Sequence, residues 1–538
     1  MSINKSQPDP DIKSIFGLEA NLDSHRSIIK STSIISLGTL GSRILGFFRD
    51  IILAKLLGTG LMADAFFLAS KIPNLFRDIV GEGATNAAVV PVLAEYREKS
   101  GKKEFWQFIN VVFTVSFIIL SVFTILGIIL SPFIVRLMAP GFIAEPAKLA
   151  LTIQLTKLMF PYLILIGLTA YCMAVLYTFR SFFVPAFSPC LLNISMIVSA
   201  YWALWTHSEP VFVLAIGVLV GGVLQLAVHF KPMWNIGMRY ERPTKLDHEG
   251  IIKIGRLLIP RVAGSGVYQL AVLIDTFCAS LSNIVGAGGI SAIYYANRIV
   301  QFPMGIFSVA LASAVLPSLS GMVTKKDFES VKKVIVFSLE NIFFVMCPTT
   351  VILFLLASPI IRILFERGEF DSYSTMITSG TLAFYALGLF SFGGIKILVT
   401  AFHALQDTKT PVKVAALCLT INAALNFILM YPLKVSGIAL ASAIAGTIDF
   451  FILFVIIERK LGRLNSGLLA YALKVSFASV LTGFVEYWGW HNTVLANDAV
   501  KLFVIGVFGF IFYGIVCYVM KIEQALKVWK WIKQGLRY

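Results

Sequence analysis

The chain carries a long series of apolar stretches, each long enough to cross a membrane as a helix. Of its 538 residues, 57% are hydrophobic and 14% are charged. A helical span needs about 20 apolar residues, and lipid admits only helices or closed barrels because their backbone groups are satisfied internally. We therefore expect an all-α polytopic membrane protein with about fourteen transmembrane helices. The expected spans are 33–57, 62–94, 106–134, 150–177, 185–205, 210–230, 254–282, 290–320, 334–357, 374–403, 412–431, 435–457, 468–489 and 499–520.

The connectors between these stretches alternate in charge. Lys and Arg gather in connectors such as 97–103, 325–333 and 459–463, whereas 58–61 and 205–210 contain neither. Basic connectors mark the cytoplasmic side of a membrane protein. This pattern places both termini in the cytoplasm, and it explains the net charge of +16 without nucleic-acid binding.

The first twelve spans look like two copies of a six-span unit. AFFLASK (65–71) resembles AIYYANR (292–298), Asp50 matches Asp275, and Pro185 matches Pro411, all at an offset of about 226 residues. Six spans is an even number, so both copies enter the membrane in the same orientation. Two such lobes around a central cavity are a known transporter plan, in which the lobes rock to open either side.

The repeat and the connectors give an expected division of the chain. The parts are a cytoplasmic N-terminal tail (1–30), an N-lobe of six spans (31–232), a cytoplasmic linker (233–253), a C-lobe of six spans (254–458), a two-span appendage (459–520) and a cytoplasmic C-terminal tail (521–538).

Charged residues lie inside several of the apolar spans. A charge at the bilayer centre costs several kcal/mol, so such residues normally face a protein interior or a wet cavity. The arginine fork binds phosphate through two hydrogen bonds and stays protonated, which suits an anionic cargo. The candidate substrate-binding residues are Ser42, Arg43, Arg49, Asn74, Arg77 and Arg298, and the candidate supporting acids, which would hold the arginines when the cargo leaves, are Asp50, Asp64 and Glu82. The alternative is that some of these charges only reach the membrane surface or bridge helices.

Motifs for catalysis are missing from the sequence. It contains no P-loop, no HExxH and no GxSxG, and its six cysteines include no CxxC pair. We therefore expect a transporter rather than an enzyme, with no prosthetic group.

Several segments carry a family resemblance. SRILGFFRD (42–50), ADAFFLASKIPNLFRD (63–78), YYANRIVQFPMGIFSVAL (294–311) and TKTPVK (408–413) resemble the MurJ family, also called MviN, of the MOP exporter superfamily. This is a family of bacterial lipid II flippases, and the resemblance covers nearly the whole chain beyond residue 30.

The resemblance implies a cargo and a site. The cargo would be undecaprenyl-pyrophosphate carrying the disaccharide-pentapeptide unit, moved from the inner to the outer leaflet of the cytoplasmic membrane by alternating access. Membrane potential or an ion gradient would drive it, and the peptidoglycan synthesis machinery would be a partner. The essential arginines would be Arg43, Arg49, Arg77 and Arg298, and a coupling Na⁺ would be held by Asp275, Asn422, Asn426 and Ser442.

Two positions depart from the family pattern. Asn297 and Gln301 stand where relatives often carry acids, so the second lobe is less acidic. The alternatives are a flippase for another lipid-linked polysaccharide unit, a drug or cation exporter, and a membrane-embedded transferase. A cation exporter would need an acid-dominated cavity, and a transferase would need acid or histidine clusters at one membrane face.

Overall fold

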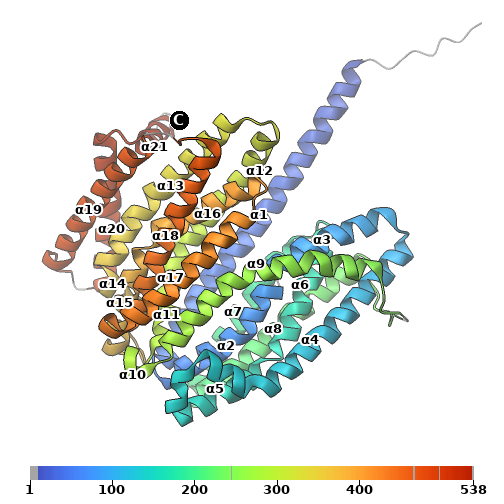
Figure 1. Cartoon of the computed structure of the whole chain (residues 1–538), viewed down its shortest axis with the longest axis horizontal. Coiled ribbons are helices and arrows are strands. Elements are labelled where there is room, and N and C mark those ends of the chain that lie inside the picture. The colour runs from blue at the N-terminus through green and yellow to red at the C-terminus, as the bar shows by residue number, and fades with distance from the viewer. Residues whose placement is uncertain (1–9, 81, 244, 465–466, 496, 536–538) are drawn as a thin grey trace, which may run out of the picture.

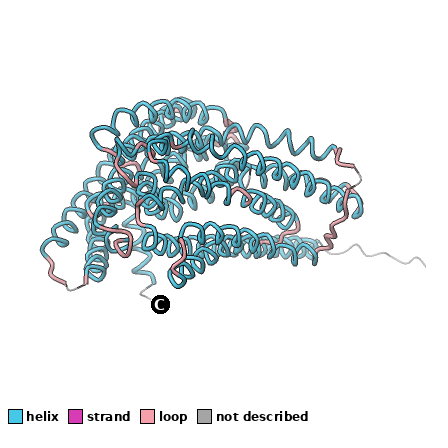
Figure 2. The backbone as a smooth tube through the Cα atoms, turned by 90° about the horizontal axis from the view of Figure 1, so that it is seen from below, coloured by secondary structure: helices cyan, strands magenta, loops and turns pink. Residues whose placement is uncertain are grey.

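The computed structural model describes residues 10–80, 82–243, 245–464, 467–495 and 497–535. Side chains are described in these ranges except at 10–32, 76–80, 82–87, 260–265, 267–268, 528 and 531–535. Figure 2 shows helix along almost all of this chain, joined by short connections, and the described residues contain no strand. The prediction of an all-α membrane protein is therefore confirmed.

The helices fall into two groups along the chain. The first group is α1 (Pro10–Leu57), α2 (Leu61–Val80), α3 (Glu82–Lys99), α4 (Lys102–Met138), the 3₁₀-helix η1 (Pro140–Ala144), α5 (Pro146–Met159), α6 (Tyr162–Thr178), α7 (Phe183–Thr206) and α8 (Pro210–Asn235). The second group is α9 (Glu249–Ala279), α10 (Ser282–Val285), α11 (Gly289–Pro303), the π-helix η2 (Met304–Ser308), α12 (Val309–Thr324), α13 (Phe328–Leu355), α14 (Ala357–Phe365), α15 (Ser372–Ala386), α16 (Leu389–Ala404), α17 (Lys409–Leu433), α18 (Val435–Leu461), α19 (Leu468–Asn492), α20 (Asp498–Val519) and α21 (Glu523–Gly535).

Fewer helices meet a length and hydropathy criterion for crossing a membrane than the sequence predicts. Among the described residues, ten helices are long and apolar enough to cross a membrane, or eleven if the bent pair α15–α16 is one span. The other three expected spans lie on α1, on α2 with α3, and on α9, which do not meet the same criterion. The count of fourteen is not confirmed.

Three of the expected spans are broken into two helices. Pro161 separates α5 from α6, because proline lacks the N–H that would continue the helical hydrogen bonds. Pro303 ends α11, and the π-helix η2 follows before α12. The axes of α15 and α16 differ by 46° around Gly388. A Cβ at Gly388 would lie 2.6 Å from the Phe392 ring, so only glycine allows this close bend.

Figure 1 shows two bundles with α1 running between them. We call α2–α8 the first bundle and α11–α18 the second bundle. Helix α1 packs along α7 of the first bundle and also contacts α14 of the second. Helices α19 and α20 form a separate pair at the outer edge of the second bundle, where α19 packs on α13.

Helix α9 connects the two bundles. It contacts α3 and α4 of the first bundle as well as α17 and α18 of the second. At its start, the His248 ring stacks on Phe108 with centroids 4.5 Å apart, and Lys253 is ion-paired with Glu95 of α3.

Hydrogen bonds join the bundles at the end where α5 and α10 lie side by side in Figure 1, which we call the closed end. They connect Thr59 to Ser374 (2.7 Å), Glu145 to Ser282 (2.5 Å), Gly141 to Ser280 (3.2 Å) and Lys55 to Glu369 (2.9 Å). The main apolar core extends through both bundles, and large apolar side chains on α4, α19 and α20 are exposed on the outside, as in a protein surrounded by lipid.

Candidate functional site

The centre of the site is the Asp50 carboxylate on α1, which is fully buried. The neighbouring Arg49 donates to Asp50 Oδ1 from Nε (3.0 Å) and from Nη2 (2.7 Å). The Tyr294 hydroxyl of α11 donates to the same oxygen at 2.9 Å and accepts from Arg49 Nη2 at 2.9 Å. A buried charge requires such partners, since an isolated carboxylate in an apolar interior is strongly disfavoured.

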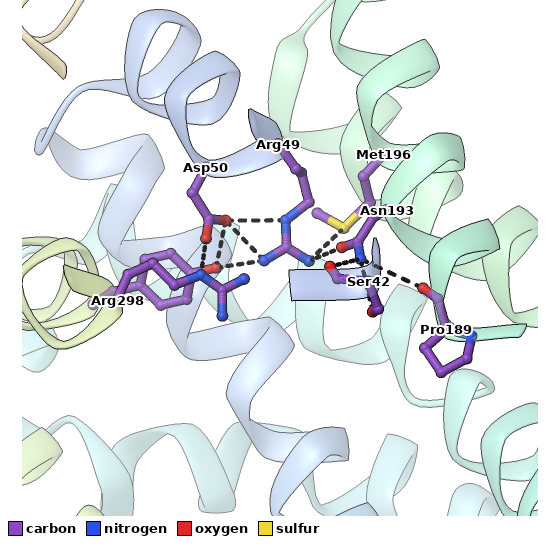
Figure 3. A network of polar contacts seen from close by, with 8 residues as sticks. Ser42, Arg49, Asp50, Pro189, Asn193, Met196 and Arg298 are labelled. Atoms are coloured by element: carbon purple, nitrogen blue, oxygen red, sulfur yellow. Dashed lines mark hydrogen bonds and ion pairs between the residues drawn. The ribbon is translucent and has the colours of Figure 1, made fainter. Parts of the chain in front are cut away.

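A second arginine reaches the same carboxylate from the other bundle. Arg298 on α11 donates from Nε to Asp50 Oδ2, as Figure 3 shows. A Cβ at Gly46 of α1 would lie 2.9 Å from Arg298 Nη2, so the absence of a side chain there lets the guanidinium approach α1. Asp50 is therefore shared by Arg49 and Arg298, which come from the two predicted repeats.

The remaining donors of Arg49 point to α7. Its Nη1 donates to Asn193 Oδ1 at 3.0 Å and lies 3.7 Å from the Met196 sulfur (Figure 3). Asn193 in turn donates to the backbone oxygen of Ser42 at 3.0 Å and to its hydroxyl at 3.3 Å. Ser42 thus belongs to the hydrogen-bonded network, and Asn193 fixes the outer end of the Arg49 side chain.

Arg43 also reaches toward the second bundle. Its guanidinium lies against Gly305 of the π-helix η2, where a Cβ would be only 1.2 Å from Arg43 Nη1. The extra residue per turn in a π-helix and the missing side chain at Gly305 together make room for this contact. Arg43, Arg49 and Arg298 all lie where α1 faces the second bundle.

A small cavity adjoins Arg49. It has a volume of about 100 Å³, and its lining includes Arg49, Ser70, Asn74 and Tyr294. Asn74 donates to the Ser70 carbonyl at 2.8 Å, and its buried Oδ1 has no hydrogen-bond partner among the described residues. Asn74 is therefore next to the arginine network with one acceptor free.

Among the predicted residues with described side chains, Asp64 does not join this network. The side chains of Arg77 and Glu82 lie outside the described residues. The expectation that Asp64 holds an arginine is wrong, because its Oδ2 is ion-paired with Lys148 of α5 at 2.8 Å. Its Oδ1 accepts from the backbone N–H of Ser291 (2.9 Å) and from the Ser291 hydroxyl (2.7 Å). Asp64 instead joins the two bundles near the closed end.

The four residues of the expected sodium site do come together. Asn426 donates to Asp275 Oδ1 at 2.7 Å and to Asn422 Oδ1 at 3.3 Å. Ser442 donates to Asp275 Oδ2 at 3.2 Å and accepts from Asn422 at 3.2 Å. Oxygen donors are the ligands of a hard cation, and the buried Asn426 Oδ1 has no hydrogen-bond partner among the described residues. This donor set fits a sodium ion.

A basic residue from the first bundle lies beside this cluster. Lys71 of α2 donates to the hydroxyl of Thr276 at 2.6 Å, and Thr276 follows Asp275 directly on α9. The cluster is therefore next to the interface between the bundles.

Charge at the arginine network favours an anion. Arg49 and Arg298 share the single negative charge of Asp50, and Arg43 adds a third guanidinium. Guanidiniums bind carboxylates and phosphates with the same paired hydrogen bonds. The network therefore carries more positive than negative charge, which suits an anionic ligand.

A family model described as lipid II flippase MurJ matches residues 53–509. The chain belongs to the MurJ family. A relative from Rhizobium tropici, named a probable lipid II flippase MurJ, is 37% identical over 442 residues, which are 81% of this chain and 81% of the relative. A relative of the same name from Buchnera aphidicola subsp. Acyrthosiphon pisum is 34% identical over 484 residues, 89% of this chain and 94% of the relative.

Solved structures agree with the family assignment. A structure titled lipid II flippase MurJ, inward closed conformation, matches with a TM-score of 0.78 at 29% identity, over 90% of this chain and 98% of that one. An inward-facing multidrug resistance MATE transporter of the MOP superfamily matches with a TM-score of 0.65 at 15% identity, over 80% of this chain and 96% of that one. The second match shows the shared MOP fold alone.

Some site residues were not predicted from the sequence. Asn193 lies inside PAFSPCLLNISMI (185–197), and Tyr294 begins the YYANR segment (294–298). A single Asn or Tyr in an apolar span is common, so neither residue stood out. Lys148 lies just before an expected span, where a lysine usually reaches the membrane surface. Only the folded structure brings these residues to Arg49 and Asp64.

Proposed function

We propose that this protein is a lipid II flippase, a transporter rather than an enzyme, that moves lipid II from the inner to the outer leaflet of the cytoplasmic membrane. Membership of the MurJ family and relatives named lipid II flippase MurJ support this proposal. The basic connectors support a cytoplasmic location of both termini.

The observation that carries the proposal is the sharing of Asp50 by Arg49 and Arg298. The pyrophosphate of the cargo would replace Asp50 as the partner of these guanidiniums, and Arg43 would add a third. Asp50 would hold the arginines again once the cargo leaves. A cation exporter is disfavoured, because Asp50, the acid described at this centre, is already paired with two arginines.

Movement of the bundles would carry the cargo across the membrane. In the described conformation the bundles are joined at the closed end. Alternating access requires these hydrogen bonds to break so that the same central site opens toward the other leaflet.

A sodium ion would couple to this movement through Asp275, Asn422, Asn426 and Ser442. Binding there would change the hydrogen bonds of α9, which contacts both bundles. In proteoliposomes we expect transport to depend on a sodium gradient and the variant Asp275→Asn to lose that dependence. Equal sodium dependence in the variant and the wild type would overturn the assignment of this cluster.

The proposal is tested by complementing a bacterium depleted of its lipid II flippase. We expect the wild type to restore growth and Arg49→Ala and Arg298→Ala to fail. Arg49→Lys is also expected to fail, because lysine keeps the charge but not the paired hydrogen bonds. Arg136→Ala is the matched control, since Arg136 is exposed at the end of α4 and donates to the Pro132 carbonyl.

The readout should include the cargo itself. Outer-leaflet lipid II can be measured by its cleavage with an externally added lipid II hydrolase, at matched amounts of transporter in the membrane. Rescue by both alanine variants would remove the role of the arginines. Failure of the wild type would favour another lipid-linked cargo.

A further inference from the structure

On the C-terminal helix α21, apolar residues at the start pack on the protein, and Trp529 further along is partly exposed. Ile522, just before the helix, and Ala525 are buried in a cluster with Val475 of α19 and Cys517 of α20. Trp529, one turn beyond Ala525 on the same side of the helix, is 46% exposed. The apolar side therefore extends beyond the surface that α19 and α20 cover.

This exposed part continues the outer surface of α20. The rings of Trp529 and Tyr518 lie 5.5 Å apart between centroids. Tyr518, Val519 and Ile515 are all exposed on α20, where an apolar surface faces acyl chains. Trp529 lies at the point where α20 ends. Trp and Tyr are enriched at this level of a membrane, where the hydrocarbon meets the headgroups.

The other side of the segment is basic. From residue 521 to the C-terminus the sequence contains four lysines and one arginine against one acid, Glu523. Lys521, Lys527 and Lys530 are exposed, and Lys527 is paired with Glu523 at 2.6 Å. The segment therefore carries a net positive charge.

Two contacts fix how the helix is rotated about its axis. Gln524 donates to Glu340 Oε2 of α13 at 3.3 Å, and Lys527 Nζ lies 5.3 Å from the centroid of the Phe337 ring. With this rotation Trp529 stays on the side of the lipid-facing surface of α20.

From these observations we propose that α21 lies in the membrane surface and binds anionic phospholipid headgroups. Trp529 enters the interface beside Tyr518, and Lys521, Lys527 and Lys530 bind headgroup phosphates. A helix with one apolar side, an aromatic anchor and lysines is suited to such a position. Lipid is favoured over a protein partner because the exposed apolar side is continuous with a surface that lipid already covers. This inference goes beyond the transport function and does not depend on the cargo.

The position of Trp529 is tested by fluorescence quenching of the full-length protein. The protein is reconstituted in phosphatidylcholine with phosphatidylglycerol, and wild type is compared with Trp529→Phe. The part of the wild-type fluorescence that the variant lacks comes from Trp529. We expect lipids brominated near the headgroup to quench this part, and aqueous iodide to leave it unquenched. Quenching of that part by iodide and not by bromolipid would overturn the proposal.

The charge preference is tested by native mass spectrometry of bound phosphatidylglycerol. In the triple variant Lys521→Gln, Lys527→Gln and Lys530→Gln, we expect the preference for phosphatidylglycerol over phosphatidylcholine to fall by about fivefold for each lysine removed. Lys434→Gln, at an exposed lysine between α17 and α18, is the matched control and should change nothing. An unchanged lipid preference in the triple variant would overturn the proposal. A dimer of the wild type that Trp529→Phe abolishes would also overturn it, because the surface would then bind a second copy of the protein.

Discussion

A single carboxylate organises the charged centre of this protein. Asp50 binds Arg49 beside it and Arg298, which is 248 residues away in sequence. Removing one partner from a buried charged group destabilises a protein much more than removing an exposed pair, because the remaining charges lose their partner in a poorly solvated place.

We expect Asp50→Asn to lower the free energy of unfolding by about 3 kcal/mol, because two partly buried arginines lose the fully buried carboxylate that pairs with them. Thermal unfolding of the purified protein measures this change. The matched control is Asp498→Asn, since Asp498 pairs with Arg362 where both side chains are about half exposed. That change should cost less than about 1 kcal/mol. Equal shifts in the two variants would contradict the central role of Asp50.

A substitution at Gly305 tests the position of Arg43 without destabilising the fold. In Gly305→Ala the new methyl group would displace the Arg43 guanidinium, which is the flexible end of a side chain. We expect flippase activity to fall about tenfold, as for loss of one charge-assisted hydrogen bond, with little change in thermal stability. Gly321→Ala on α12 is the control, since a Cβ there meets nothing within 4 Å. Equal activity of the two variants would exclude a role for Arg43 at this position.

Charge inside an apolar span is a signal that sequence can show, and it identified Arg43, Arg49, Asp50 and Arg298 as candidates. It could not identify what each charge binds. Asp64 is an example, because its partner Lys148 is 84 residues away and lay outside the expected spans. Pairing between helices depends on packing, which hydropathy does not record.

At the scale of helices, the end of α1 is a point of close contact. Gly58 has φ +58°, and a Cβ there would lie 2.2 Å from the Glu369 carbonyl oxygen. The Lys55 carbonyl accepts a hydrogen bond from the Glu369 N–H at 2.9 Å. This turn therefore holds α1 against the connector between α14 and α15.

We expect Gly58→Ala to destabilise the described conformation by more than about 1 kcal/mol, because alanine disfavours positive φ and its methyl group would meet backbone. Gly60→Ala is the control two residues away, where a Cβ meets nothing within 4 Å. Thermal unfolding compares the two. If Gly58→Ala were as stable as Gly60→Ala, the contact between α1 and Glu369 would not stabilise the described conformation.

The sequence located most of these helices but not the breaks at Pro161 and Gly388. Hydropathy averages over a span, so a proline such as Pro161 or a glycine such as Gly388 hardly changes it. The helix breaks at Pro161 because proline lacks the N–H. The bend at Gly388 follows from close packing on Phe392.

At the scale of the whole molecule, two bundles meet at one end and share one charged centre. The sequence predicted the all-helical fold and the gathering of arginines from both halves, because both follow from local residue patterns. It did not predict the hydrogen bonds of the closed end. Those bonds form at helix ends and in connectors, where residues such as Thr59 and Ser282 are common.

The closed end offers a test of movement. Glu145 and Ser282 lie within one hydrogen bond, so the double variant Glu145→Cys and Ser282→Cys should be linked by a short thiol cross-linker. We expect cross-linking to stop lipid II transport and reduction of a cleavable linker to restore it. The single cysteine variants, treated in the same way, control for modification alone. Full transport by the linked protein would show that this end does not open.

Helix α9 is continuous, and its two ends pack on different bundles. Its last turns are fixed by buried amide and hydroxyl bonds at Asp275, whereas its start is held by ring stacking on His248 and an exposed ion pair, Lys253 with Glu95, worth about 1 kcal/mol at most. If the bundles tilt relative to each other, α9 must either bend or lose its contacts with one of them. Because α9 is continuous, a movement of one bundle would be transmitted along it between the Asp275 cluster and the contacts with α3.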